Sequence, residues 1–185
     1  MPVDFPDQLK NARTPHPNPG TRRPDSRAAP AGGRNQQLVE TGPGPEQFNT
    51  VHAVEVSNDG LVYVADRSND RVQVFTIDGE YLTQAFINRG GPGNSAAGIA
   101  LSPDLEQRFI YVADFGGASV VVMDRRTLEV LYQFGDSSGT AGNFVIRGPH
   151  HMAVDSKGNL YSAEVHPGNR VQKFMFMGLG PPPRQ

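Results

Sequence analysis

The chain has 185 residues, a net charge of −2 and no cysteine, and 37% of its residues are hydrophobic. Its length allows one domain of ordinary size with a buried core. The lack of cysteine excludes disulfides, thiolate zinc ligands and a cysteine nucleophile. Glycine (21) and proline (16) are abundant, which favours many short strands and turns over long helices. No apolar run approaches the roughly 20 residues of a membrane-spanning helix, so we expect a soluble protein without a membrane partner.

Residues 1–37 combine many prolines and arginines with few branched apolar side chains. Such a segment cannot bury enough surface to offset the entropy of ordering it, so we predict a disordered leader. Its prolines interrupt the apolar stretch that a signal peptide needs, so no signal peptide is predicted and the cell compartment is left open. After residue 37, acidic residues outnumber basic ones. This excess of negative charge argues against a nucleic-acid partner.

From Leu38 onward, short apolar runs alternate with clusters of Asn, Asp, Gly and Ser, the pattern of strands and turns. The pattern repeats three times. Each unit has an apolar strand, a turn, a strand of the form Tyr-x-Ala-acid, a polar turn and a third strand. The units are VHAVEVSNDGLVYVADRSNDRVQVF (51–75), AGIALSPDLEQRFIYVADFGGASVVVM (97–123) and PHHMAVDSKGNLYSAEVHPGNRVQKF (149–174).

A fourth strand follows in the first two units, at residues 80–86 and 128–134, whereas the last unit lacks one. Four short antiparallel strands in a period of about 50 residues are typical of a β-propeller blade. Neighbouring blades cover both faces of a strand, which explains why runs such as SVVVM are continuously apolar. A β-sandwich would not explain the repeat.

The sequence therefore predicts an all-β fold, a partial β-propeller of about 2.7 four-stranded antiparallel blades. The predicted segments are the leader (1–37), the propeller (38–178) with blades at 38–90, 91–135 and 136–178, and a flexible tail (179–185).

Two of the units closely resemble NHL repeats, which form the blades of six-bladed propellers. They share Gly-x-Gly-x-x-x-Phe or Pro-His before a strand, then Tyr-x-Ala-acid and Arg-Val-Gln-x-Phe. The resemblance covers about residues 38–178 and implies a six-bladed parent. Among NHL propellers, the order of features looks most like the peptidyl-α-hydroxyglycine α-amidating lyase group.

In that family, three blades each contribute one histidine to a zinc ion in the central channel, and an arginine approaches the substrate. By resemblance, His52 and His150 are zinc ligands and Arg67 is a substrate contact, while Ala97 occupies the equivalent place in the intervening blade. The third histidine and the family's catalytic tyrosine belong to upstream blades, which we expect this chain to lack. The resemblance thus implies a remnant metal site, and a zinc-dependent lyase only in a full-length parent.

The residues by themselves leave other interpretations open. Each histidine could bond the backbone of a tight turn, and Arg67 could form an ion pair with Asp66 or Asp70. Alternation along a strand places His151 opposite His150, so one of the two should face the channel, and His166 is expected in an exposed turn. Residues that recur in every blade are expected to serve the scaffold or the core: Asp66, Asp114 and Glu164, and Tyr63, Tyr111 and Tyr161.

Three function classes follow from these observations. The first is an amidating-lyase-related propeller that binds a small carboxylate-bearing or peptide ligand beside zinc. The second is a non-enzymatic binding module, since propellers present loops from several blades as a surface. The third is a lactonase-like hydrolase, although no repeat begins with the acidic or amide residue that such a site needs. An incomplete ring would also expose apolar blade faces, which predicts self-association.

Overall fold

The computed structural model describes residues 2–5, 44–45 and 47–179. Within them the chain forms three sheets and, apart from β1, the neighbouring strands of each sheet follow chain order. We call these sheets the first, second and third blade. The first blade consists of β2 (Val51–Val56), β3 (Leu61–Asp66), β4 (Arg71–Thr76) and β5 (Tyr81–Phe86). The second consists of β6 (Ala96–Leu101), β7 (Phe109–Asp114), β8 (Ser119–Asp124) and β9 (Val130–Phe134). The third contains β10 (Pro149–Val154), β11 (Leu160–Glu164) and β12 (Arg170–Leu179).

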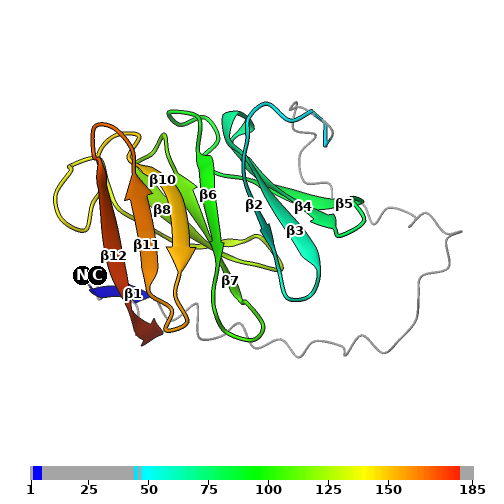
Figure 1. Cartoon of the computed structure of the whole chain (residues 1–185). Coiled ribbons are helices and arrows are strands. Elements are labelled where there is room, and N and C mark those ends of the chain that lie inside the picture. The colour runs from blue at the N-terminus through cyan, green and yellow to red at the C-terminus, as the bar shows by residue number, and fades with distance from the viewer. Residues whose placement is uncertain (1, 6–43, 46, 180–185) are drawn as a thin grey trace, which may run out of the picture.

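The inner strands of the three blades lie side by side. Figure 1 shows β6 in the centre, with β10 on one side and β2 on the other, and β6 contacts both of these strands. The sheets therefore fan out from a common line, as the blades of a propeller do. This arrangement confirms the predicted fold. Within the described ranges, no helix is long and apolar enough to span a membrane.

Burial along the strands follows the position of each blade. All residues of β7 and five of six in β8 are buried, because the second blade is covered on both faces. In β11, by contrast, buried and more exposed residues alternate along the whole strand, since among the described residues another blade packs on only one face of the third blade. The continuous apolar runs of the sequence thus mark the blade that has two neighbours.

Two hydrophobic clusters join the blades. The first joins Tyr63 and Val72 of the first blade to Ile99 and Ile110 of the second. The second joins residues of the second blade, such as Tyr111 and Val120, to residues of the third, such as Met152, Leu160 and Phe174. The core therefore lies between the blades, with a separate hydrophobic cluster at each blade boundary.

The third blade has a fourth strand that the repeat pattern does not contain. Strand β1 (Pro2–Phe5), from the start of the chain, pairs with the outer strand β12 in parallel orientation. Residues 2–5 of the predicted leader over 1–37 form this strand, and the rest of that segment lies outside the described residues. Leu179, predicted to begin the tail, ends β12 instead, and residues 180–185 also lie outside the described ranges.

Candidate functional site

The two predicted zinc ligands sit at irregularities in their strands. In β2 the pairing with β3 shifts between Val51 and Ala53, and in β10 the pairing with β11 shifts between Pro149 and His151. His52 and His150 are thus the extra residues of two equivalent β-bulges. A bulge turns a side chain out of the regular alternation and is common beside functional sites. Both histidines are redirected in the same way at the same end of the inner strands.

The structure brings these histidines together. Their ring centroids are 4.4 Å apart and the ring planes are inclined at 77°. The Nδ1 atom of His52 lies 2.9 Å from the carbonyl oxygen of Ala97. Because a carbonyl oxygen only accepts hydrogen bonds, Nδ1 is the donor, and in the neutral tautomer with this bond Nε2 keeps its lone pair. This bond runs from the first blade to strand β6 of the second blade rather than closing a turn, and it leaves Nε2 of His52 available as a ligand.

Close approach of the inner strands depends on a small residue next to Ala97. A Cβ atom added at Gly98 would lie 3.0 Å from the carbonyl oxygen of His150 and 3.0 Å from the Cα atom of His151. These distances are shorter than ordinary van der Waals contact, so β6 and β10 would have to separate slightly. Gly98 thus allows the third blade to bring His150 near the first blade.

The surroundings of His150 favour a neutral imidazole. Burial lowers the pKa of His150 below its usual 6.5, and the electrostatic influence of the neighbouring His52, Arg67 and His151 side chains lowers it further. A neutral imidazole is the form that binds a metal ion. His166 lies exposed in a turn of the third blade, as expected, and His151 is also exposed.

Arg67 and Phe115 form the wall of the site beside the histidines. The guanidinium carbon of Arg67 lies 5.4 Å from the centre of the Phe115 ring, and that ring lies 5.5 Å from the ring of His150. The Nε atom of Arg67 is buried and has no hydrogen-bond partner among the residues that the structure describes. Sequence reasoning missed Phe115. The signal was its position directly after the Tyr-x-Ala-Asp strand of the second blade, where the first blade has Arg67.

The recurring acids hold the turns together. Asp66 accepts hydrogen bonds from the backbone amides of Asn49 and Thr50, and it forms an ion pair of 2.9 Å with Arg71 in which both side chains are fully buried. Asp114 and Glu164 likewise accept backbone amides, those of Gly117 and Val145. The expected scaffold role is confirmed. The sequence suggested Asp66 as an ion-pair partner of Arg67. In the structure Asp66 pairs with Arg71 instead.

The donor set fits part of a zinc site. A catalytic zinc ion has three protein ligands and one open position, and His52 and His150 supply two nitrogens. In the part of the chain that the structure describes, no three His, Cys, Asp or Glu side chains are grouped so as to hold a metal ion. The zinc-binding role of the pair stays a prediction, as does the substrate role of Arg67.

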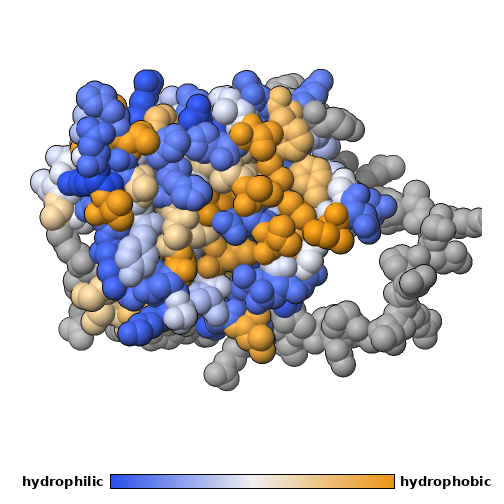
Figure 2. All heavy atoms as spheres, viewed as in Figure 1, coloured by the Kyte–Doolittle hydropathy of each residue, from blue (hydrophilic) through white to orange (hydrophobic). Residues whose placement is uncertain are grey.

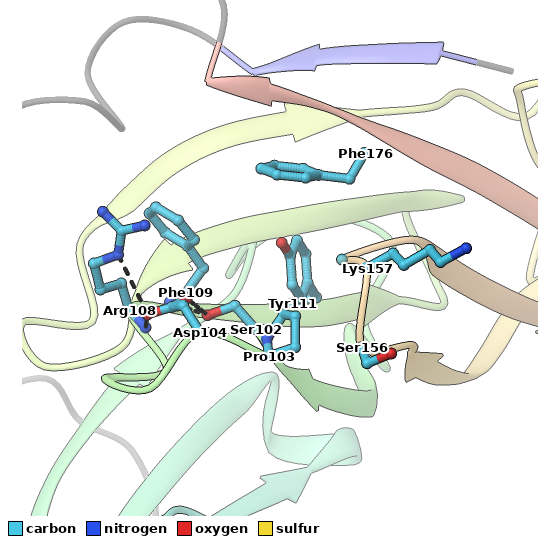
Figure 3. Close-up of a pocket in the computed structure, with 10 residues that line it drawn as sticks. Ser102, Pro103, Asp104, Arg108, Phe109, Tyr111, Ser156, Lys157 and Phe176 are labelled. Carbon is cyan, nitrogen blue, oxygen red and sulfur yellow. Dashed lines mark hydrogen bonds and ion pairs between the residues drawn. The ribbon is translucent and has the colours of Figure 1, made fainter.

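A separate cavity of about 260 Å³ lies at the other end of the inner strands. Figure 3 shows it between the turn that follows β6 and the turn that follows β10, with Tyr111 and Phe176 over it and Lys157 at one side. Burial raises the pKa of Tyr111 to about 12, so this phenol is neutral. Arg108 at its edge is bound to Asp104 at 3.3 Å. The cavity shares no residue with the histidine site.

Comparison with known proteins identifies the repeat. Residues 48–75 match the family model of the NHL repeat. This segment is an NHL repeat. The matched residues run from just before β2 to within β4 of the first blade, so they include His52 and Arg67.

Longer NHL proteins are similar to this chain over most of its length. NHL repeat-containing protein 3 from Homo sapiens is 31% identical over 145 residues, covering 74% of this chain and 38% of its own length. The Mus musculus protein of the same name is 29% identical over 171 residues, covering 78% and 44%. The chain thus spans less than half the length of these two relatives.

Solved structures with the same fold include two lyases. A streptogramin B lyase structure matches with a TM-score of 0.50 and 14% identity, covering 74% of this chain and 44% of that one. A catalytically inactive virginiamycin B lyase from Staphylococcus aureus, solved with quinupristin, also matches with a TM-score of 0.50, at 13% identity, covering 72% and 43%. At such identities the likeness concerns the fold alone, and the finer resemblance to amidating lyases stays a prediction.

Proposed function

We propose that the mouth of the channel binds zinc through His52 and His150, and that Arg67 holds a carboxylate of a small or peptide ligand beside it. The strongest support is that His52 of the first blade and His150 of the third blade, both at β-bulges, have ring centroids only 4.4 Å apart. Two histidines that merely stabilised their own turns would have no reason to converge.

The hydrogen bonding of His52 suits a metal ligand. Metal-binding histidines usually donate their second N–H group to a carbonyl or carboxylate oxygen, which fixes the tautomer and orients the ring. The bond from Nδ1 of His52 to Ala97 has this form. The lowered pKa of His150 adds a second neutral donor at pH 7. Two ligands bind zinc more weakly than three, so the proposed affinity is modest.

Arg67 suits recognition of a carboxylate. Its guanidinium can donate two parallel hydrogen bonds to one carboxylate group, and its buried Nε atom has no hydrogen-bond partner within residues 2–5, 44–45 and 47–179. Phe115 offers an apolar surface between Arg67 and His150. A ligand with a carboxylate next to a small apolar group would satisfy both features.

The proposed activity of a full-length parent is that of a zinc-dependent lyase. In such a parent, a further blade would add the third ligand, and the bound zinc would act as a Lewis acid. For this chain we propose binding, because its described residues offer two imidazoles. The second candidate, a non-enzymatic binding module, uses the same Arg67 and Phe115 contacts and is favoured by the small number of ligands. No contact within the described ranges favours the lactonase-like hydrolase.

Zinc titration by calorimetry tests the metal site. We expect wild-type protein to bind zinc, and the double variant His52→Ala/His150→Ala to bind it at least tenfold more weakly, because ligand loss costs more than the loss of a supporting bond. His166→Ala is the matched control, since His166 is an exposed histidine in another turn. Equal zinc affinity in the double variant and the control would remove the metal from the proposal.

A second titration tests Arg67 with N-acetylglycine as a peptide-like carboxylate probe. Arg67→Lys keeps the charge but loses the two-bond geometry, so we expect binding to weaken about tenfold. Arg126→Lys, on an exposed turn of the second blade, should bind as wild type does. Unchanged binding in the Arg67 variant would contradict the proposed carboxylate contact.

A further inference from the structure

Each blade boundary inside the chain uses the same pair of faces. On one side, the first blade contributes Tyr63, Ala65 and Val72, which are at most 1% exposed. Strand pairing aligns these residues with Tyr111, Ala113 and Val120 of the second blade, which are equally buried against the third. We call this the forward face of a blade.

Within the described residues, no other blade covers the forward face of the third blade. Its equivalent residues are Tyr161, Ala163 and Val171. Val171 is 70% exposed, whereas its counterparts Val72 and Val120 are 0% exposed. Lys173 replaces a valine on this face, and its ammonium lies 5.3 Å from the centre of the Tyr161 ring. The third blade thus presents the tyrosine, alanine and valine positions that its predecessors use to bind the next blade.

The face of a blade opposite the forward face is called the backward face. In the first blade, this backward face is exposed. Strand pairing aligns Val54 with Ile99 of the second blade and Met152 of the third. Ile99 and Met152 are 0% and 3% exposed at the two blade boundaries, but Val54 is 59% exposed. Val56, two residues on, is 53% exposed. Figure 2 shows apolar side chains gathered over the region of β2 and β3.

These two open faces bound one gap, because three blades that fan out from a common line leave a single opening between the last blade and the first. The two faces are also complementary. At both boundaries inside the chain, the forward face of one blade packs on the backward face of the next blade. Blades of propellers close into rings of four to eight. Two copies of three blades supply six.

We propose that two copies of this chain assemble head to tail into a closed ring of six blades. The third blade of each copy packs its forward face on the backward face of the first blade of the other. The ring has a two-fold axis and two identical boundaries, and each boundary repeats the packing seen between the blades of one chain. The proposal is independent of zinc, but the ring would bring the histidine pairs of both copies to one channel.

The molar mass in solution tests the ring directly. One chain has a mass of 20.0 kDa. Sedimentation or light scattering of the purified chain should give the mass of two chains, with no larger species as the concentration rises, because a closed ring has no free face. A single-chain mass throughout, or a ladder of growing oligomers, would overturn the proposal.

Two charge substitutions test which faces meet. Val171→Glu on the forward face and Val54→Glu on the backward face each place a charge in both boundaries, so each should weaken the dimer by roughly a hundredfold. Both side chains are exposed in the single chain, so the fold should persist, as circular dichroism would verify. Leu105→Glu is the control, because Leu105 is 89% exposed in a turn of the second blade, and this variant should stay dimeric.

Mixing the two variants separates head-to-tail packing from other modes. In a mixed pair, one boundary carries both glutamates and the other carries none, so the two variants together should form a dimer that neither forms alone. If either variant alone remains as dimeric as the control, packing of forward face on backward face is wrong.

Discussion

Two imidazoles meet at one end of the inner strands because each is the extra residue of a β-bulge. Regular alternation alone would fix each side chain to one face of its sheet, and the shifts at His52 and His150 release both from it. The repeat placed the two histidines at equivalent positions, so their convergence was predictable from the sequence. The bulges and the bond from His52 to Ala97 were not, because they depend on how β6 lies between its neighbours.

The histidine site predicts a specific pH dependence of stability. The pKa of His150 is lower in the folded protein than its usual 6.5. As the pH falls below 6.5, the unfolded chain therefore binds more protons, and the free energy of unfolding decreases until the pH passes the folded value. Urea unfolding at about pH 7 and about pH 5.5 measures this loss. His150→Gln should reduce it, and an equal loss in His150→Gln and wild type would contradict the assignment.

The buried ion pair of the first blade predicts a large effect at one arginine. Arg71→Met leaves the carboxylate of Asp66 buried without its cation and should lower the free energy of unfolding by about 3–5 kcal/mol. Arg108→Met breaks a partly exposed pair with Asp104 and should cost about 0–1 kcal/mol. Chemical unfolding of both variants measures the difference. Similar losses in the two variants would mean that burial of the Asp66 pair has little energetic weight.

The second blade packs against both other blades and joins them. Its strands β7 and β8 contribute to both hydrophobic clusters. Their continuous apolar sequence predicted this two-sided burial, since a strand with one solvent face would alternate. Strand β1 could not be predicted, because four residues in a proline-rich segment carry no repeat signal and its partner β12 lies at the far end of the sequence.

The central position of the second blade predicts a large cost for a cavity in it. Ile110 of β7 is 0% exposed, whereas Ile146, in the loop before the third blade, is 61% exposed. Ile110→Ala should lower the free energy of unfolding by about 2–5 kcal/mol, and Ile146→Ala by no more than about 0.5 kcal/mol. Denaturant unfolding of the two variants provides the comparison. If Ile146→Ala proved as costly as Ile110→Ala, the assignment of the core to the blade boundaries would be wrong.

In the whole molecule, the three blades form an arc. The exposed faces at its two ends carry the same types of apolar residue that are buried at the boundaries between blades. The similar NHL proteins are more than twice as long as the matched region, which leaves room in them for further blades. In this chain the end faces carry exposed valines where internal blades bury them. The repeat made the open faces predictable, but their pairing into one gap follows only from the fanned arrangement of the sheets.

The proposed zinc site requires that the first and third blades, which are not neighbours in sequence, direct His52 and His150 at one zinc ion. Nitrogen-detected NMR of the histidine side chains, recorded as zinc is added, tests it most directly. The claim predicts that His52 carries its proton on Nδ1, and that the signals of His52 and His150 shift together while those of His166 stay unchanged. A proton on Nε2 of His52, or shifts of His52 and His150 at different zinc concentrations, would contradict it.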